Sequence, residues 1–201
     1  MGDVSLINST IKGCHASKRG GALHMRESGD VSLLGSRVED SRAEINGGFL
    51  ETYKSGSLHM TRSSVVKCSA KQWGGAVNSW YGGGVYVRDS SISGCKAGKA
   101  GGAIVFKEPR LHETVQLVGS TFSDNLAGIN QEGAASVLLY TVSDDMLVDY
   151  AVARRAMRLS KELSKELSDY LGKSFVRASS FVNNTATFDV TILTTAPLVW
   201  Q

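Results

Sequence analysis

The chain has 201 residues, which is enough for one domain of ordinary size or two small ones. Its 22 Lys and Arg against 19 Asp and Glu leave a net charge of +3, too small to indicate a nucleic acid or an anionic membrane as partner. No apolar run reaches the ~18–20 residues of a membrane helix, and no signal peptide is visible at the N-terminus. With 22 glycines and 2 prolines, the composition indicates many tight turns between hydrogen-bonded segments.

A repeat of 27 residues organises most of the chain. Its anchor is a serine that recurs at spacings of 27, 27, 27, 30 and 59 residues. The anchors are Ser9, Ser36, Ser63, Ser90, Ser120 and Ser179. Apolar and polar residues alternate within each copy, which is typical of short β-strands, and no helical stretch interrupts the unit. We therefore predict that each copy is one coil of a parallel β-helix with about three short strands.

The repeated positions predict contacts between neighbouring coils, with equivalent residues in ladders about 4.8 Å apart. An alanine follows every anchor by seven residues, where we expect a crowded corner. Gly-Gly pairs follow the first four anchors by eleven residues, and we expect positive φ or tight packing at one glycine of each pair.

The position five residues after each anchor holds cysteine, serine or asparagine, which can all form hydrogen bonds. Asparagine there is expected to hydrogen-bond along the stack, and cysteine or serine to replace it. Cys68 and Cys95 fall in adjacent coils and could touch, but a disulfide needs about 5.5 Å between Cα atoms, so a reduced, buried stack is favoured. The residues of this ladder are Cys14, Ser41, Cys68, Cys95, Asn125 and Asn184.

The repeat is interrupted between the last two anchors. Residues 144–172 contain apolar residues near helical spacing and a charged face, which predicts an amphipathic helix with a bend near 158–160. The predicted fold is therefore all-β, a single-stranded parallel β-helix of about six coils with one amphipathic α-helical insertion. The domain boundaries that follow are coils over 1–143, the insertion over 144–173, and a resumed coil with a C-terminal strand over 174–201.

Recurring short motifs carry a resemblance to a known family. Gly101-Gly102-Ala103-Ile104, with Phe122-Ser123-Asp124-Asn125 and Phe181-Val182-Asn183-Asn184, resembles the GGA(I/L/V) and FxxN motifs of the polymorphic outer membrane protein repeat family of chlamydial surface autotransporters. The resemblance spans about residues 4–136 and 175–187. It implies a right-handed parallel β-helix at a cell surface or outside the cell, with adhesion as the usual role and a host-cell or matrix protein or glycan as partner.

Five aromatic residues are the candidate binding site, because aromatic side chains on an exposed turn stack on sugar rings or anchor a protein partner. The alternative is that they shield the edge of the core, which is the commoner use of aromatic residues. The five are Tyr53, Trp73, Trp80, Tyr81 and Tyr86.

No catalytic or metal site is expected. The four histidines occupy unrelated positions, and the acids Glu39, Asp40 and Glu44 are expected to lie in a solvated turn. One outward ladder, His24, Glu51, Asn78 and Val105, is mixed in character. We therefore expect a non-enzymatic adhesion or recognition protein that is a fragment of a longer array, without cofactor, nucleic-acid partner or membrane span. The alternatives are a carbohydrate-active β-helix enzyme, which would need stacked acids on one sheet face, and a purely structural fragment of a longer array.

Overall fold

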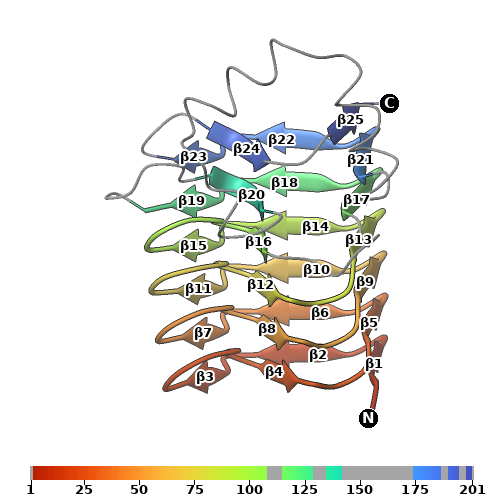
Figure 1. Cartoon of the computed structure of the whole chain (residues 1–201), viewed down its shortest axis with the longest axis vertical. Helices are drawn as coiled ribbons and strands as arrows, with labels where there is room; N and C mark the ends of the chain where they lie inside the picture. Colours follow the sequence, from red (N-terminus) through yellow and green to blue (C-terminus); the bar gives the residue numbers. More distant parts are fainter. Residues whose placement is uncertain are drawn as a thin grey trace.

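The computed structural model describes residues 2–107, 115–128, 135–141, 174–186, 190–194 and 198–200. These residues form parallel strands that stack in four columns, with the N-terminal coil at one end (Figure 1). The described ranges contain no helix. The helical insertion predicted over 144–172 lies outside them.

Each column of strands is one parallel sheet, and we name the four sheets A to D in the order in which the chain visits them. Sheet A contains β1 (Val4–Ile7), β5 (Val31–Leu34), β9 (Leu58–Thr61), β13 (Val85–Arg88), β17 (Val115–Val118), β21 (Ser174–Arg177) and β25 (Leu198–Trp200). Sheet B contains β2 (Thr10–Lys12), β6 (Arg37–Glu39), β10 (Ser64–Val66), β14 (Ser91–Ser93), β18 (Thr121–Ser123) and β22 (Ser180–Val182). Sheet C contains β3 (His15–Ala16), β7 (Arg42–Ala43), β11 (Ser69–Ala70), β15 (Lys96–Ala97), β19 (Leu126–Ala127) and β23 (Thr185–Ala186). Sheet D contains β4 (Leu23–Arg26), β8 (Leu50–Tyr53), β12 (Val77–Trp80), β16 (Ile104–Lys107), β20 (Ala135–Thr141) and β24 (Val190–Thr194).

A coil has four strands, so the prediction of about three is wrong. The additional strand is the two-residue strand of sheet C, whose second residue is always the repeated alanine. The sequence analysis placed this alanine at a crowded corner. The strand was missed because two residues are too few to show an alternating pattern. The alanine instead faces the core within a strand, and Ala43 has no solvent exposure.

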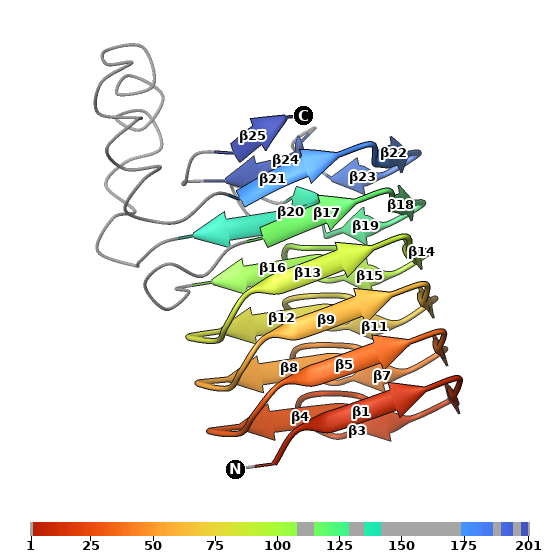
Figure 2. The ribbon, with the colours of Figure 1, turned by 90° about the vertical axis from the view of Figure 1, so that its right-hand side faces the viewer.

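Four complete coils lie in the continuous stretch 2–107 (Figure 2). Later strands extend the same four sheets, but the connections between them include segments outside the described residues. The count of about six coils came from six anchor serines, and the structure has four uninterrupted ones. The 30- and 59-residue spacings place additional chain between the later anchors.

The predicted register is confirmed at every ladder in the four coils. Val4 pairs with Val31, which pairs with Leu58 and then Val85, and the alanines of sheet C pair in the same way. The inward residues of sheets A, B and D form one continuous core, which includes Met60, Val65 and Phe122. The repeated alanines of sheet C are buried as well, as at Ala43 and Ala97. Burial on this scale stabilises each coil by about 25 cal/mol per Å² of apolar surface removed from water.

The anchor serines form a hydrogen-bonded ladder along the corner between sheets A and B. Each backbone N–H donates to the hydroxyl of the next serine, as from Ser36 to Ser63 and from Ser63 to Ser90, both at 3.1 Å. Each hydroxyl in turn donates to the carbonyl two residues back, as from Ser63 to Thr61 at 2.9 Å. The serine is therefore required because its one side-chain oxygen accepts from the neighbouring coil and donates within its own.

The four corners of a coil each contain a residue with positive φ. At the C-to-D corner this residue is the first glycine of every Gly-Gly pair, with φ between +62° and +67°. The second glycine has no room for a side chain, because a Cβ on Gly75 would lie 2.0 Å from the carbonyl oxygen of Gly102. Both expectations for the Gly-Gly pairs are confirmed.

Candidate functional site

The candidate site is a cluster of three aromatic side chains at the corner between sheets D and A. Tyr53 and Trp80 occupy equivalent positions at the ends of β8 and β12 and are paired in register. Their rings meet edge to face, with centroids 6.1 Å apart. Tyr81 follows Trp80 at the turn, where its φ is +53°, and this conformation directs its ring back over the cluster. The Trp80 and Tyr81 rings stack at 5.7 Å, and those of Tyr53 and Tyr81 meet edge to face at 5.8 Å.

Cations surround these rings. The row through Tyr53 and Trp80 continues to Arg26 in the coil before and to Lys107 in the coil after. The Arg26 guanidinium lies 5.6 Å and the Lys54 ammonium 5.5 Å from the centre of the Tyr53 ring, and the Lys107 ammonium lies 4.9 Å from that of Trp80. Ring quadrupoles attract cations at such distances. We call these six residues the corner cluster.

One polar atom of the corner cluster is unpaired. The Trp80 Nε1 is buried and has no hydrogen-bond partner in the part of the chain that the structure describes. Tyr81 is 37% exposed, which makes it one of the large hydrophobic side chains on the surface. The cluster thus presents an aromatic surface with positive charge around it.

The other two candidate aromatic residues lie elsewhere, so the five do not form one site. Trp73 packs on Ala100 and Val105, on the segment that covers sheet D. Tyr86 is in sheet A, where its ring stacks on that of His59 at 4.8 Å. Trp73 and Tyr86 both lie where the 27-residue spacing of the repeat predicts them. The sequence placed them near Trp80 only because they are close along the chain.

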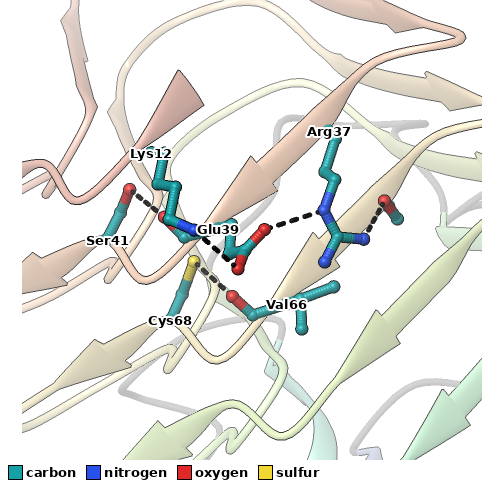
Figure 3. Close-up of polar contacts among 7 residues, drawn as sticks. Lys12, Arg37, Glu39, Ser41, Val66 and Cys68 are labelled. Atoms are coloured by element: carbon teal, nitrogen blue, oxygen red, sulfur yellow. Dashed lines mark hydrogen bonds and ion pairs between the residues drawn. The ribbon is translucent and has the colours of Figure 1, made fainter. Parts of the chain in front are cut away.

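The polar ladder lies at the corner between sheets B and C. The Asn125 side-chain amide donates to Asn184 Oδ1 and to the Ile92 carbonyl, both at 3.0 Å, which confirms the expected asparagine ladder. Cys14, Cys68 and Cys95 are free thiols, and Cys68 and Cys95 are fully buried. Cys68 points at the Val66 carbonyl, 3.7 Å from the sulfur (Figure 3). Burial raises the pKa of Cys95 well above its usual value.

Two acids near this corner, Glu39 and Glu44, are paired with bases. Figure 3 shows Glu39 between Lys12 and Arg37, at 3.3 and 2.9 Å. The hydrogen bonds from Arg37 and Lys12 lower the pKa of Glu39. A carboxylate held in its charged form is a poor proton donor at neutral pH, so Glu39 is not suited to general-acid chemistry.

A buried acid on sheet D escaped the sequence analysis. The ladder of His24, Glu51, Asn78 and Val105 was expected to face outward. His24 is exposed, but Glu51, Asn78 and Val105 are buried beneath a covering segment of the chain. Glu51 has no solvent exposure, and its Oε2 has no hydrogen-bond partner among the described residues. Its Oε1 accepts from Asn78 at 3.4 Å and lies 3.6 Å from Arg19. Burial raises the pKa of Glu51 to about 7.

The segment that buries Glu51 runs from sheet C to the Gly-Gly pair in each coil. Trp73 lies on it and covers Val105 in the same manner. The apolar residues Trp73 and Val105, which lie outside the alternating core pattern, are the sequence signal that could have revealed this second layer.

Within the described ranges, no group of three or more His, Cys, Asp and Glu side chains has the arrangement of a metal site. The same ranges contain no helix of the length and apolar character needed to cross a membrane. Searches against family models, curated proteins and solved structures gave no match for this chain. The fold itself defines the chain as a parallel β-solenoid, and its assignment to a family remains a prediction.

Proposed function

We propose that this chain is a non-enzymatic recognition module, in which the solenoid supports the corner cluster as the binding surface for a protein partner. The observation that carries the proposal is the packing of the Tyr53, Trp80 and Tyr81 rings on one another, with cations over the first two of them. Tyr, Trp and Arg are the residue types that supply most of the binding energy at protein interfaces. Strand pairing on both sides of β12 holds the cluster rigid, which lowers the entropy cost of binding.

A protein partner suits the corner cluster better than a neutral sugar. Stacking on a sugar requires a free ring face, and cations lie over the Tyr53 and Trp80 rings. The exposed Tyr81 and the surrounding positive charges instead match an apolar contact bordered by acidic side chains.

The alternative of a carbohydrate-active enzyme has one supporting feature, the raised pKa of Glu51, since a carboxyl group that stays protonated near neutral pH is a good general acid. The Glu51 side chain has no solvent exposure, however, so a substrate would need the covering segment to open. We therefore favour recognition over catalysis.

The resemblance to the polymorphic outer membrane protein repeat family supports a location at a cell surface or outside the cell, and adhesion as the form of recognition. The right-handed winding, a continuation to six coils and the helical excursion over 144–173 belong to the same proposal. Far-UV circular dichroism of the whole chain tests the excursion, because about 25 helical residues would add a helical signal to that of a β-solenoid.

Beads coated with the chain, applied to cultured epithelial cells in excess soluble heparin and hyaluronate so that binding to acidic glycans is suppressed, test the binding role. The variant combines Trp80→Thr with Tyr81→Asn, since Thr is favoured in strands and Asn tolerates positive φ. The matched control is Tyr86→Gln, which copies the Gln116 of the next coil. We expect the double variant to lose most binding, the control to keep it, and trypsin treatment of the cells to abolish it. Full binding by the double variant, or loss only after enzymatic removal of cell-surface glycans, would overturn the proposal.

A further inference from the structure

The net positive charge of the four coils is concentrated on one flank. We define the basic strip as residues 14–21, 41–48, 68–75 and 95–102, which are the strands of sheet C in these coils with the segments that follow them. The strip contains six Lys and Arg side chains and one acid, Glu44. The remainder of residues 2–107 contains eight basic and seven acidic residues and is nearly neutral. The six bases are Lys18, Arg19, Arg42, Lys71, Lys96 and Lys99.

The register of the coils aligns these charges along the stack. Arg42, Ser69 and Lys96 are successive members of one row of sheet C, at the strand spacing of about 4.8 Å. Lys71 lies two residues beyond Ser69, and the side chains of Arg42, Lys71 and Lys96 are exposed. In Figure 1 this flank is the column of β3, β7, β11 and β15, an uninterrupted face along the solenoid.

The basic strip is hollowed where the charges gather. A depression of about 470 Å³ opens on the outside of sheet C, with Arg42, Lys71, Lys96, Ser69, Gly98 and Leu126 in its lining. Gly98 stands where Lys71 stands one coil earlier, so the missing side chain leaves this space. A Cβ on Gly98 would lie 2.0 Å from the Lys71 carbonyl oxygen. Glycine is therefore required by the backbone approach, and the depression is a fixed feature of the coil.

One acid holds the bases in place without neutralising them. The Glu44 carboxylate forms ion pairs with Lys71 and Arg42, the latter at 3.0 Å, and lies 3.3 Å from His15 Nε2. The hydrogen bond from Lys71 contributes most to lowering the pKa of Glu44 to about 2. Two cations thus share one negative charge, and Glu44 forms no ion pair with Lys96. Cations ordered in advance lose less entropy when an anionic ligand binds.

We propose that the basic strip binds a linear acidic polysaccharide, with its sulfate or carboxylate groups paired to Arg42, Lys71 and Lys96 around the depression. Charge complementarity over several coils requires a polyanion, and a row parallel to the solenoid axis suits a linear one. This surface is separate from the corner cluster and does not depend on the function proposed for it.

A nucleic acid fits this surface less well. Single strands are held by aromatic side chains on which bases stack, and the one aromatic residue of the strip, Trp73, is engaged with Ala100 and Val105. Duplex DNA is read by a helix or a two-stranded ribbon inserted into a groove, whereas the strip is a hollowed sheet face. Its chemistry therefore favours a polysaccharide.

The test is binding of the whole chain to size-defined heparin and hyaluronate, with neutral dextran and single- and double-stranded DNA as competing probes. The variant is Arg42→Ser/Lys71→Ser/Lys96→Ser, which the repeat itself suggests. Ser69 already occupies the row of Arg42 and Lys96, and Ser17 occupies that of Lys71. The control is Arg37→Ser/Arg62→Asn/Arg88→Thr, which removes the same charge elsewhere and copies Ser64, Asn8 and Thr61 of the same rows.

We expect the wild-type chain to bind at least one of the two acidic polysaccharides in 0.15 M salt with a salt-dependent Kd, and to ignore dextran. The strip variant should bind at least about tenfold more weakly, and the control variant within about threefold of wild type, because a contact surface and not net charge determines affinity. Tyr81→Asn should have no effect, which separates this site from the corner cluster. Equal losses in strip and control variants, tighter binding of DNA, or no binding of either polysaccharide would each overturn the proposal.

Discussion

Replacing Glu51 by glutamine should remove a pH-dependent loss of stability from the solenoid. The carboxyl group is fully buried beneath the segment between sheets C and D, with Oε2 unpaired among the described residues. Burial raises its pKa from 4.5 to about 7, against the opposing effects of Arg19, Asn46 and Asn78. Glutamine has the same shape and no charge at any pH.

The sign follows from which state binds the proton more tightly. Below pH 4.5 the group is protonated in both the folded and the unfolded chain, and it has no effect on the pH dependence. Between pH 4.5 and 7 the unfolded chain releases the proton while the folded chain holds it, so the free energy of unfolding falls as the pH rises. The difference of the two pKa values corresponds to about 3 kcal/mol at ~1.36 kcal/mol per unit, fully developed above pH 7.

The assay is urea denaturation of wild type and Glu51→Gln between pH 4 and 8, with the difference in unfolding free energy plotted against pH. That difference should grow in favour of the variant by about 3 kcal/mol over this range. His24 pairs in register with Glu51, and its own pKa is lowered by partial burial and by Arg19 and Arg26. The comparison is therefore repeated with His24→Asn, which copies Asn78 of the same row.

Two results would refute this reasoning. A difference that does not change with pH would mean that Glu51 ionises as readily in the folded chain as in the unfolded one. A carboxyl resonance of Glu51 that titrates near pH 4.5 in carbon-13 NMR of the folded chain would demonstrate the same ionisation directly. The Glu44→Gln variant, compared with wild type between pH 2 and 5, is a control of opposite sign. The lowered pKa of Glu44 stabilises the fold above pH 4.5, and that contribution is lost as the pH falls towards 2.

Three further predictions concern the ladders. Gly75→Val should lower the free energy of unfolding by more than ~1 kcal/mol, because the added Cβ meets the Gly102 carbonyl. Gly94→Asn should be tolerated, because no atom lies closer than 3.4 Å to its added Cβ. Equal thermal midpoints for the two variants would contradict this. Ser63→Ala should cost ~1–3 kcal/mol in urea denaturation because it leaves the buried N–H of Ser36 unpaired, while Ser64→Ala on the outer face should cost far less; similar losses would argue against the ladder. Labelling with a thiol reagent should modify Cys14 in the folded chain and Cys68 and Cys95 only in urea, since both are fully buried, and rapid labelling of all three without denaturant would show that the coils open.

Register was predictable because it depends on residues that must be of one type. A serine that accepts from one coil and donates within its own cannot be exchanged freely, so Ser9 to Ser90 recur at a constant spacing. The same holds for a glycine whose Cβ would meet the next coil, as at Gly75. These contacts made the parallel solenoid recognisable from spacing alone.

Corners and short strands were harder to predict because several residue types satisfy them. Positive φ is adopted at one corner by Asn8 and Arg62 and at another by Glu27 and Lys54, so no single residue type marks the turn. The strands of sheet C have two residues, too few for an alternating pattern. A coil of four strands was therefore predicted from the sequence as one of about three.

The candidate site was predicted only in part, because proximity in this fold is measured in multiples of the coil length. Arg26, Tyr53, Trp80 and Lys107 are neighbours although 27 residues separate each from the next. Trp73 and Tyr86 are closer to Trp80 in sequence and lie on other faces. Comparing equivalent positions of successive coils would have separated them without a structure.

The same comparison separates the parts of the repeat that determine the fold from those available for binding. Inward positions keep one residue type or one size from coil to coil, because neighbouring coils pack against them. Outward positions vary freely, as in the row Arg42, Ser69, Lys96, where strand pairing places no demand on the side chain. An excess of one charge or of aromatic residues in such positions is not required by the coil. The corner cluster and the basic strip are the two places in the four coils where the variable outward positions have an excess of aromatic or basic residues. Binding can therefore be tested at each of them by substitutions that do not disturb the fold.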